Sequence, residues 1–281
     1  MAEGKSISRV IVDKVLLLGL AVVILAPIVA GFVLLAPGHT GMVTSHAELE
    51  DVSDEEELVV SRNLGDDALG ELARLKNLRE LQLHYSDITD VGMKRVGACG
   101  TLHKLVLTAE HVTDGGLAHL GNLKLLQELI LAGMPAITDD GLACLAELPE
   151  LRRLSIIRCP GIGPHLGKKL AGLKLEFLDL EQCRAVGDEA ATGIAKLLDL
   201  KHLNLNFCEA LGDEGIGQLA ALPNLEVLTL HGVSRMSDVA LTAIARLKSL
   251  KVLHLPLHTA PISSAGIEKL KAALPGCEIN R

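Results

Sequence analysis

The feature that most constrains this chain is a six-residue phrase, Leu-x-x-Leu-x-Leu, that returns every 24 or 25 residues. A repeat of this length is typical of a solenoid, in which each unit buries its apolar side against its neighbours. The phrase therefore predicts one elongated domain with a broad surface rather than a deep catalytic pocket. A shortened copy begins at Leu274, and the full copies begin at Leu78, Leu102, Leu126, Leu151, Leu175, Leu200, Leu225 and Leu250.

The third unit illustrates how one repeat is built. Its opening leucines, Leu129 and Leu131, alternate with other residues, which is typical of a short strand with one buried face. After a loop, Leu142, Leu145 and Leu148 recur every three residues, which predicts a short helix with its apolar side toward the strand. Each repeat is therefore expected to run strand, loop, helix, loop.

A hydroxyl residue followed by an aspartate marks the start of most of these predicted helices. Such a pair can accept backbone hydrogen bonds and favours the positive end of the helix dipole. A calcium site is the alternative, but calcium requires six or more oxygens converging on one point, so we predict capping and no metal. The pair is Thr138-Asp139 in the third unit and returns as Thr89-Asp90, Thr113-Asp114 and Ser237-Asp238.

Two parts of the array depart from the pattern. Residues 64–75 match the helical part of the repeat, but the strand before them, around residues 57–59, is degraded and acidic, as expected of an amino-terminal cap. In the fourth unit, residues 161–165 lack the aspartate and contain Pro164, which predicts a shortened helix. The repeat domain is predicted to span residues 58–281.

Composition agrees with this architecture and excludes one class of partner. Aromatic residues make up 1% of the chain, which suits a narrow core of stacked leucines. The net charge is −8, and beyond residue 36 the chain has 24 basic and 33 acidic residues, so we expect no nucleic-acid partner. The same acidity favours a basic patch on a partner protein.

The amino-terminal end contains a second strong signal. Residues 15–36 form a stretch of 22 residues without a charge, long enough for a helix to cross a hydrocarbon core of about 30 Å. The alternative is a cleaved signal peptide, but its apolar region normally has only about 7–15 residues. We therefore predict a single transmembrane helix over residues 15–36, preceded by a cytoplasmic tail (residues 1–14) and followed by an acidic linker (residues 37–57).

Flanking charge gives the predicted orientation of this helix. Lys5, Arg9 and Lys14 precede it, whereas acidic residues follow it. Basic residues stay on the cytoplasmic side of a membrane. The chain is therefore predicted to be a single-pass membrane protein with a cytoplasmic amino terminus and extracytoplasmic repeats.

Three cysteines occupy the same position in successive units. Cys159, Cys183 and Cys208 each lie three residues after the last strand leucine or isoleucine of their repeats. The chain has no Cys-x-x-Cys, so a zinc or redox motif has no support. Export would permit disulfides, and a Cys183–Cys208 bridge is not excluded by distance.

At this point the chain resembles leucine-rich repeat proteins of the cysteine-containing subtype, as found in F-box substrate receptors and in many bacterial proteins. The segment from Leu200 to Ile216 carries the subtype's pattern, and the resemblance covers roughly residues 58–281. It implies an α/β solenoid, or horseshoe, with a parallel concave sheet and convex helices. It also implies that the three thiols are free and buried, with weak S–H bonds to the backbone.

No catalytic motif accompanies the repeats, so we expect a binding protein without a cofactor or small-molecule substrate. The candidate surface is the concave sheet, formed by the strand residues between the leucines. An ordinary solvated polar face is the alternative reading of the same positions. The residues predicted to bind a partner protein are Tyr85, Arg158, Asp179, Glu181, Asn204, Asn206, Phe207, His231 and His254.

The sequence thus favours a non-enzymatic, membrane-tethered module that binds another protein through its repeats. The alternative is an F-box-type adaptor or regulatory subunit that uses the same surface. The resemblance implies that such an adaptor has a helical F-box ahead of its repeats. This chain has an apolar span and an acidic segment in that place, which disfavours the adaptor.

Overall fold

The computed structural model describes residues 45–52, 58–257 and 260–281. The predicted cytoplasmic tail and the predicted transmembrane helix, residues 15–36, lie outside these ranges. None of the helices in the described part has the length and apolarity needed to cross a bilayer.

Within the described ranges, ten strands form one sheet, and each strand pairs in parallel with the next strand along the chain. The leucines stay in register from strand to strand, as in the pairs Leu81–Leu105 and Leu105–Leu129. This arrangement confirms the predicted parallel sheet of a repeat solenoid. The strands are β1 (Leu58–Arg62), β2 (Glu80–His84), β3 (Lys104–Leu107), β4 (Glu128–Ala132), β5 (Arg153–Ile157), β6 (Phe177–Asp179), β7 (His202–Asn204), β8 (Val227–Thr229), β9 (Val252–His254) and β10 (Glu278–Asn280).

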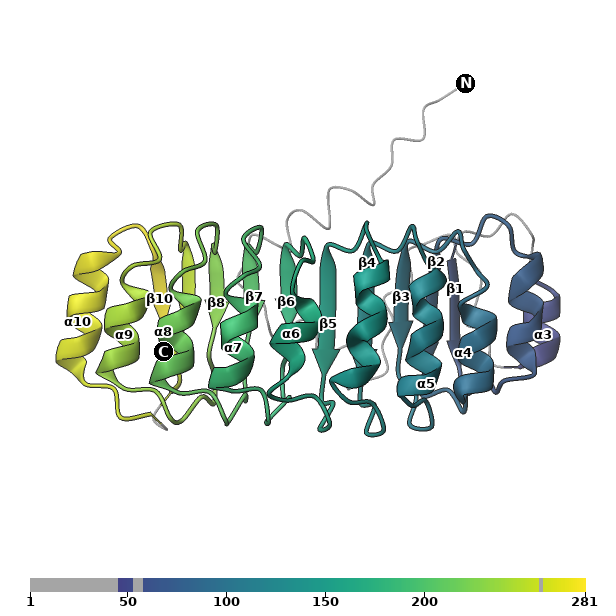
Figure 1. Cartoon of the computed structure of the whole chain (residues 1–281), viewed down its shortest axis with the longest axis horizontal. Coiled ribbons are helices and arrows are strands. Elements are labelled where there is room, and N and C mark those ends of the chain that lie inside the picture. Colours follow the sequence, from purple (N-terminus) through teal and green to yellow (C-terminus); the bar gives the residue numbers. More distant parts are fainter. Residues whose placement is uncertain (1–44, 53–57, 258–259) are drawn as a thin grey trace, which may run out of the picture. The chain divides into compact units, whose positions relative to one another are not determined.

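Short helices cover one face of this sheet (Figure 1). Several are 3₁₀ helices, and in the third unit this explains the spacing of Leu142, Leu145 and Leu148, because a 3₁₀ helix has three residues per turn. The shortened helix predicted for the fourth unit is α6, with five residues. The helices are α3 (His46–Glu50), η1 (Ala68–Arg74), α4 (Asp90–Val96), α5 (Asp114–Leu117), η2 (Ala118–Asn122), η3 (Asp140–Glu147), α6 (Leu166–Leu170), α7 (Asp188–Ile194), α8 (Asp213–Leu219), α9 (Asp238–Ile244) and α10 (Ser264–Ala273).

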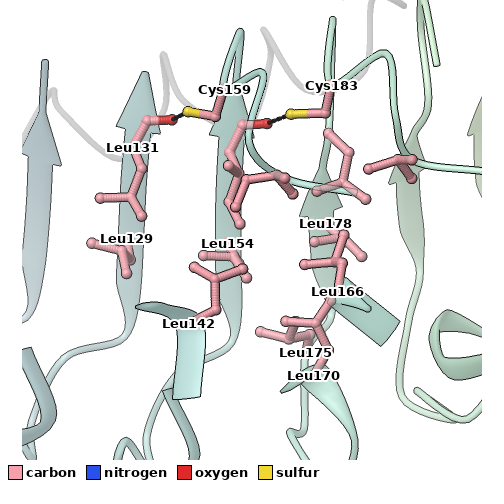
Figure 2. Close-up of a cluster of buried hydrophobic side chains, with 14 of the residues drawn as sticks. Leu129, Leu131, Leu142, Leu154, Cys159, Leu166, Leu170, Leu175, Leu178 and Cys183 are labelled. Carbon is pink, nitrogen blue, oxygen red and sulfur yellow. Dashed lines mark hydrogen bonds between the residues drawn. The ribbon is translucent and has the colours of Figure 1, made fainter. Parts of the chain in front are cut away.

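The core is a stack of leucines between sheet and helices, closed at one end of the strands by thiols (Figure 2). The Cys183 thiol donates to the Ile156 carbonyl at 3.2 Å, and the Cys208 thiol donates to the Leu180 carbonyl at 3.3 Å. Burial raises the pKa of the Cys183 thiol to about 12, so it is a poor nucleophile. The cysteines are free, as the resemblance implied.

The recurring aspartates connect successive repeats. Thr113 caps its own helix, because its hydroxyl accepts a hydrogen bond from the Gly115 N–H at 3.2 Å. Asp114 instead reaches the next unit, where its carboxylate accepts the N–H and the hydroxyl of Thr138 at 2.8 and 2.6 Å. The predicted capping role is therefore right for the hydroxyl residues, whereas the aspartates bridge neighbouring units. The bridging residues are Asp66, Asp90, Asp114, Asp139, Asp188, Asp213 and Asp238.

This aspartate bridge explains the glycine that follows two residues after several of the aspartates. A β-carbon on Gly116 would collide with the carboxylate of Asp90 from the preceding unit. The same conflict exists between Gly141 and Asp114. The glycine therefore provides space for the bridge that arrives from its neighbour.

Two sequence predictions about the region before the repeats need correction. Helix α3 lies inside residues 37–57, which we predicted as a linker, and its Leu49 is buried in the core. The Arg74 guanidinium fixes this helix by donating to the carbonyls of Leu49 and Val52, both at 2.7 Å. A single leucine in an acidic segment gives too little periodicity to reveal this cap.

The acidity also lies mainly outside the repeats. Residues 58–281 contain 24 basic and 26 acidic residues, so their charges nearly balance. The prediction of an acidic repeat domain is therefore wrong, because the excess of carboxylates belongs to residues 48–57. Charge complementarity with a basic partner consequently has no support from the repeats themselves.

Candidate partner-binding face

We use the term sheet face for the side of β2–β9 that points away from the helices in Figure 1. Because side chains alternate along a strand, the residues between the buried leucines lie on this face. Within β6, for example, Phe177 is half-buried, whereas Leu178 is fully buried. Each repeat therefore contributes two or three side chains to the sheet face.

All three aromatic residues of the described part lie on the sheet face or at its carboxyl edge. They are Tyr85 after β2, Phe177 in β6 and Phe207 after β7. Tyr85 is 53% exposed and Phe207 is 42% exposed. Aromatic side chains usually contribute their large apolar area to a core, but here none packs among the leucines. The position of these side chains therefore singles out this face of the domain.

Two of these aromatics and one arginine occupy a strained turn. Tyr85, Arg158 and Phe207 have φ angles of 49°, 56° and 58°, in the left-handed region. Gly133 and Gly232 take the same position in their repeats, with φ angles of 62° and 75°. A side chain at such a position costs roughly 1–2 kcal/mol relative to glycine. The turn thus requires this backbone conformation, and the chain places large exposed side chains where glycine would fit without strain.

Phe207 is held in place by the neighbouring repeat. Its ring lies directly over Gly232, so that a β-carbon on this glycine would collide with the ring. The Phe207 side chain is therefore both exposed and supported from below. This combination is typical of an interface anchor, which loses little conformational entropy on binding.

The structure assigns a different role to Asp179 and Asn204, which we predicted to bind a partner. The Asp179 carboxylate accepts the Glu181 N–H at 2.9 Å, and the Asn204 carbonyl oxygen accepts the Asn206 N–H at 2.9 Å. A side chain that bonds the backbone two residues later forms an Asx turn. This turn ends β6 at Asp179 and β7 at Asn204.

The same polar groups form a network across the next strands. The Asn206 side chain accepts the His231 N–H at 2.8 Å, and Asn204 accepts the Thr229 hydroxyl at 2.6 Å. Asp179, Glu181 and Asn206 are 6%, 4% and 5% exposed. These three side chains are therefore buried rather than solvent-facing as predicted. Asp179 and Asn206 accept backbone N–H groups, and Glu181 accepts the Asn204 side-chain amide.

Burial also affects the ionisation of this network. It raises the pKa of Asp179 to about 6, against its hydrogen bond from the backbone of Glu181. It likewise raises the pKa of Glu181, against a hydrogen bond from Asn204 and the nearby charge of Arg158. Asp179 therefore takes up its proton as pH falls below neutrality, and its burial suits a structural group better than a charged contact.

His231 and His254 lie side by side at the end of the predicted set. Their ring centroids are 5.3 Å apart, and both side chains are half-buried. Burial lowers the pKa of His254, with a further contribution from His231, so His254 is neutral at pH 7. Among the residues that the structure describes, no cluster of three or more histidine, cysteine or carboxylate groups could hold a metal ion.

The structure adds a group that we did not predict. The Arg153 guanidinium lies 4.2 Å from the Phe177 ring centroid, and the His202 ring lies 6.1 Å beyond that centroid. Glu128 holds the other side of Arg153 at 3.8 Å. The signal was available in the sequence, since Phe177 is a rare aromatic residue at a strand position. The candidate site thus consists of this stack and the edge residues Tyr85, Arg158 and Phe207.

Sequence comparison agrees with the repeat geometry. A leucine-rich repeat family model matches residues 74–97 and residues 197–220. These segments carry helix α4 and helix α8, each preceded by the leucine phrase. The repeat geometry and these two matches support a leucine-rich repeat protein.

Solved structures share the same fold. A crystal structure of the yeast Rad7 and Elc1 complex matches with a TM-score of 0.56 and 20% identity, covering 83% of this chain and 70% of that chain. An internalin of Listeria monocytogenes matches with a TM-score of 0.60 and 24% identity, covering 87% of this chain and 64% of that one. Internalin C2 of the same bacterium gives a TM-score of 0.52 at 23% identity, covering 76% and 84%. At these identities the likeness concerns the fold alone.

Proposed function

We propose that this protein is a non-enzymatic interaction module that binds a partner protein on its sheet face. The observation that carries the proposal is the placement of Tyr85, Phe177 and Phe207 on that face and its edge. Arginine and large aromatic residues supply most of the binding energy at protein interfaces. Arg153 and Arg158 accompany them here.

An ordinary solvated face explains the placement of these aromatic residues less well than a binding face does. On an ordinary solvated face, the strained turn would favour glycine or asparagine, which adopt this conformation at low cost. Tyr85 and Phe207 are instead large, apolar and exposed at that turn. A partner that covers them would offset the cost of both features.

Alanine substitutions at the three aromatic residues test the proposal. We expect Tyr85→Ala, Phe177→Ala and Phe207→Ala together to reduce recovery of cross-linked partners at least about tenfold, because each anchor contributes about 1–2 kcal/mol. The matched control is Leu198→Ala with Val239→Ala, since these side chains are 59% and 65% exposed but lie away from the sheet face. Equal loss in both variants, or no loss in either, would contradict the proposal.

We propose further that residues 15–36 tether the module to a membrane, with the repeats on the extracytoplasmic side. The support is the length of this uncharged stretch and the basic residues before it. Protease added to intact cells should then digest the repeats. Digestion only after the plasma membrane is permeabilised would refute this topology.

An adaptor is the second candidate function. The observation in its favour is the fold shared with the Rad7–Elc1 crystal structure. An adaptor would use the same sheet face to recruit a substrate and a second surface to contact an assembly. Protection of the repeats in intact cells, combined with loss of partners in the aromatic variant, would favour this function over a tethered module.

A further inference from the structure

The aspartate bridges are not continuous along the solenoid. Asp139 links the third unit to the fourth, and Asp188 links the fifth to the sixth through the N–H groups of Gly212 and Gly215, at 2.8 and 3.0 Å. In the described part, a bridge crosses each junction from the cap to the eighth unit except one. The exception is the junction between the unit that begins at Leu151 and the unit that begins at Leu175, which we term the 4/5 junction.

The carboxylate of the bridge is missing at the 4/5 junction. The fourth unit has Pro164 at the aspartate position, whereas Gly187 keeps the backbone N–H that Gly163 and Gly212 use to receive the bridge at their own junctions. Pro164 has neither a carboxylate nor a side-chain hydrogen-bonding group. The start of α7 therefore lacks the anchor from the preceding unit that helices such as α4, α8 and α9 receive.

Other contacts cross the 4/5 junction in place of the bridge, among them the Arg153 guanidinium over the Phe177 ring at 4.2 Å. Gly167 of α6 and Gly193 of α7 approach so closely that a β-carbon on either would collide with the other's backbone. This contact joins backbone to backbone, since neither glycine has a side chain. Glu189 pairs with His165 and Lys168, both at 3.2 Å, but these groups are more than half exposed and solvent screens the pairs. The thiol bond from Cys183 also crosses, but equivalent bonds cross neighbouring junctions.

We propose that the solenoid opens at the 4/5 junction, so that units one to four and units five to eight form two separate cooperative blocks. In a repeat protein, stability is a sum over units and over the interfaces between neighbours, so the weakest interface decides where the array divides. The inference rests on the fold and does not require the proposed function. Because Arg158 and Phe207 lie on opposite sides of this junction, opening would change the spacing of these two edge residues.

Hydrogen exchange of the full chain tests the proposal with matched amides. Glu176 and Phe177 donate to the Arg152 carbonyl across the 4/5 junction, at 2.8 and 3.1 Å. Lys201 and His202 donate to the Glu176 carbonyl across the next junction, at 2.9 and 3.1 Å. We expect the first pair to exchange at least about tenfold faster than the second under conditions that favour the folded state. Equal protection factors would overturn the proposal.

A repaired junction provides the second test. Pro164→Asp supplies the missing carboxylate, and Ala190 leaves space for it, since Ala240 at the same repeat position receives Asp213 at 3.2 Å. We expect this variant to slow exchange at Glu176 and Phe177 about tenfold and to leave Lys201 and His202 unchanged. Pro160→Asp is the control, because it adds the same charge at an exposed proline of the same unit.

Each result of the repair experiment either supports or overturns opening at the 4/5 junction. Slower exchange in Pro164→Asp but not in Pro160→Asp supports the opening. No change in either variant overturns it, as does equal slowing in both. Should Pro164→Asp fail to fold, the comparison of amides within the unaltered chain remains sufficient.

Discussion

The two halves of the sheet face are built from the same repeat but differ in strand length. Strands β2–β5 have four or five residues, whereas β6–β9 have three. At the third strand position the first half has Gln82, Val106, Ile130 and Ser155. The second half has Asp179, Asn204, Thr229 and His254. The side chain at the third strand position therefore changes together with the length of the strand.

The difference shows that a polar residue on a solenoid strand has two possible uses. In β6 and β7 the Asx side chain takes the backbone N–H that would otherwise extend the strand ladder. In β4 and β5 the aliphatic or hydroxyl residue leaves the ladder intact, and pairing continues to Ala132 and Ile157. A row of amides on a sheet face is therefore weak evidence for ligand binding until its backbone bonds are known.

The largest expected effect is a difference in the free energy of unfolding between alanine variants in the two halves. Asn204→Ala leaves the Asn206 N–H and the buried Thr229 hydroxyl without their acceptor, so we expect the free energy of unfolding to fall by about 2–4 kcal/mol. The matched variant in the first half is Gln82→Ala, whose side chain bonds only partly buried groups of Glu80 and His84. We expect it to cost less than about 1 kcal/mol. Urea denaturation measures both values, and similar losses would remove the distinction between the halves.

A smaller effect concerns pH. The fold raises the pKa of Asp179 from 3.8 to about 6, so the folded state binds this proton more tightly than the unfolded state. By linkage, the contribution of Asp179 to stability then falls as pH rises from about 4 to about 6. Asp179→Asn keeps the acceptor for the Glu181 N–H without a charge. We expect it to raise the free energy of unfolding by about 1–3 kcal/mol at pH 7 and by almost nothing below about pH 4.

The aspartate bridges titrate in the opposite sense, which makes a control necessary. The Ser263 hydroxyl and N–H lower the pKa of Asp238, so its stabilising contribution is present above about pH 4 and is lost as pH falls below that. The measurement is therefore the difference between Asp179→Asn and the unaltered chain at each pH, obtained from urea denaturation. A difference that does not change between pH 4 and pH 7 would contradict a raised pKa at Asp179.

The sequence predicts the fold well because the fold depends on period and alternation. Leucine spacing gives the strands, their parallel order and the position of the thiols, and the proline of the fourth unit gives the short α6. Contacts between units are harder to predict. Asp114 and Thr138, for example, lie 24 residues apart, and the identity of either residue does not indicate which residue it bonds. The cap formed by α3 was missed for the same reason, since Leu49 and Arg74, whose guanidinium donates to the Leu49 carbonyl, lie 25 residues apart.

The candidate site is predicted less completely. Composition alone identifies Tyr85 and Phe207, because aromatic residues are rare in this chain and these two fall just after strands. Composition does not distinguish a free polar side chain from one that bonds the backbone, so it does not reveal the turn bonds of Asp179 and Asn204 or the bond from the His231 N–H to Asn206. In β7 the strand ends one residue before its leucine, where the Asn204 side chain accepts the Asn206 N–H, and no periodicity reveals that bond.

The bridging aspartates give the array a direction of assembly. Each unit except the fourth provides the acceptor that completes the start of its successor, so a unit depends on the one before it and stabilises the one after it. Duplication of one such unit would copy the donor and the acceptor together and keep the bridges to both neighbours. A protein built in this way can gain repeats by gene duplication, one unit at a time, without new contacts having to evolve between neighbouring units.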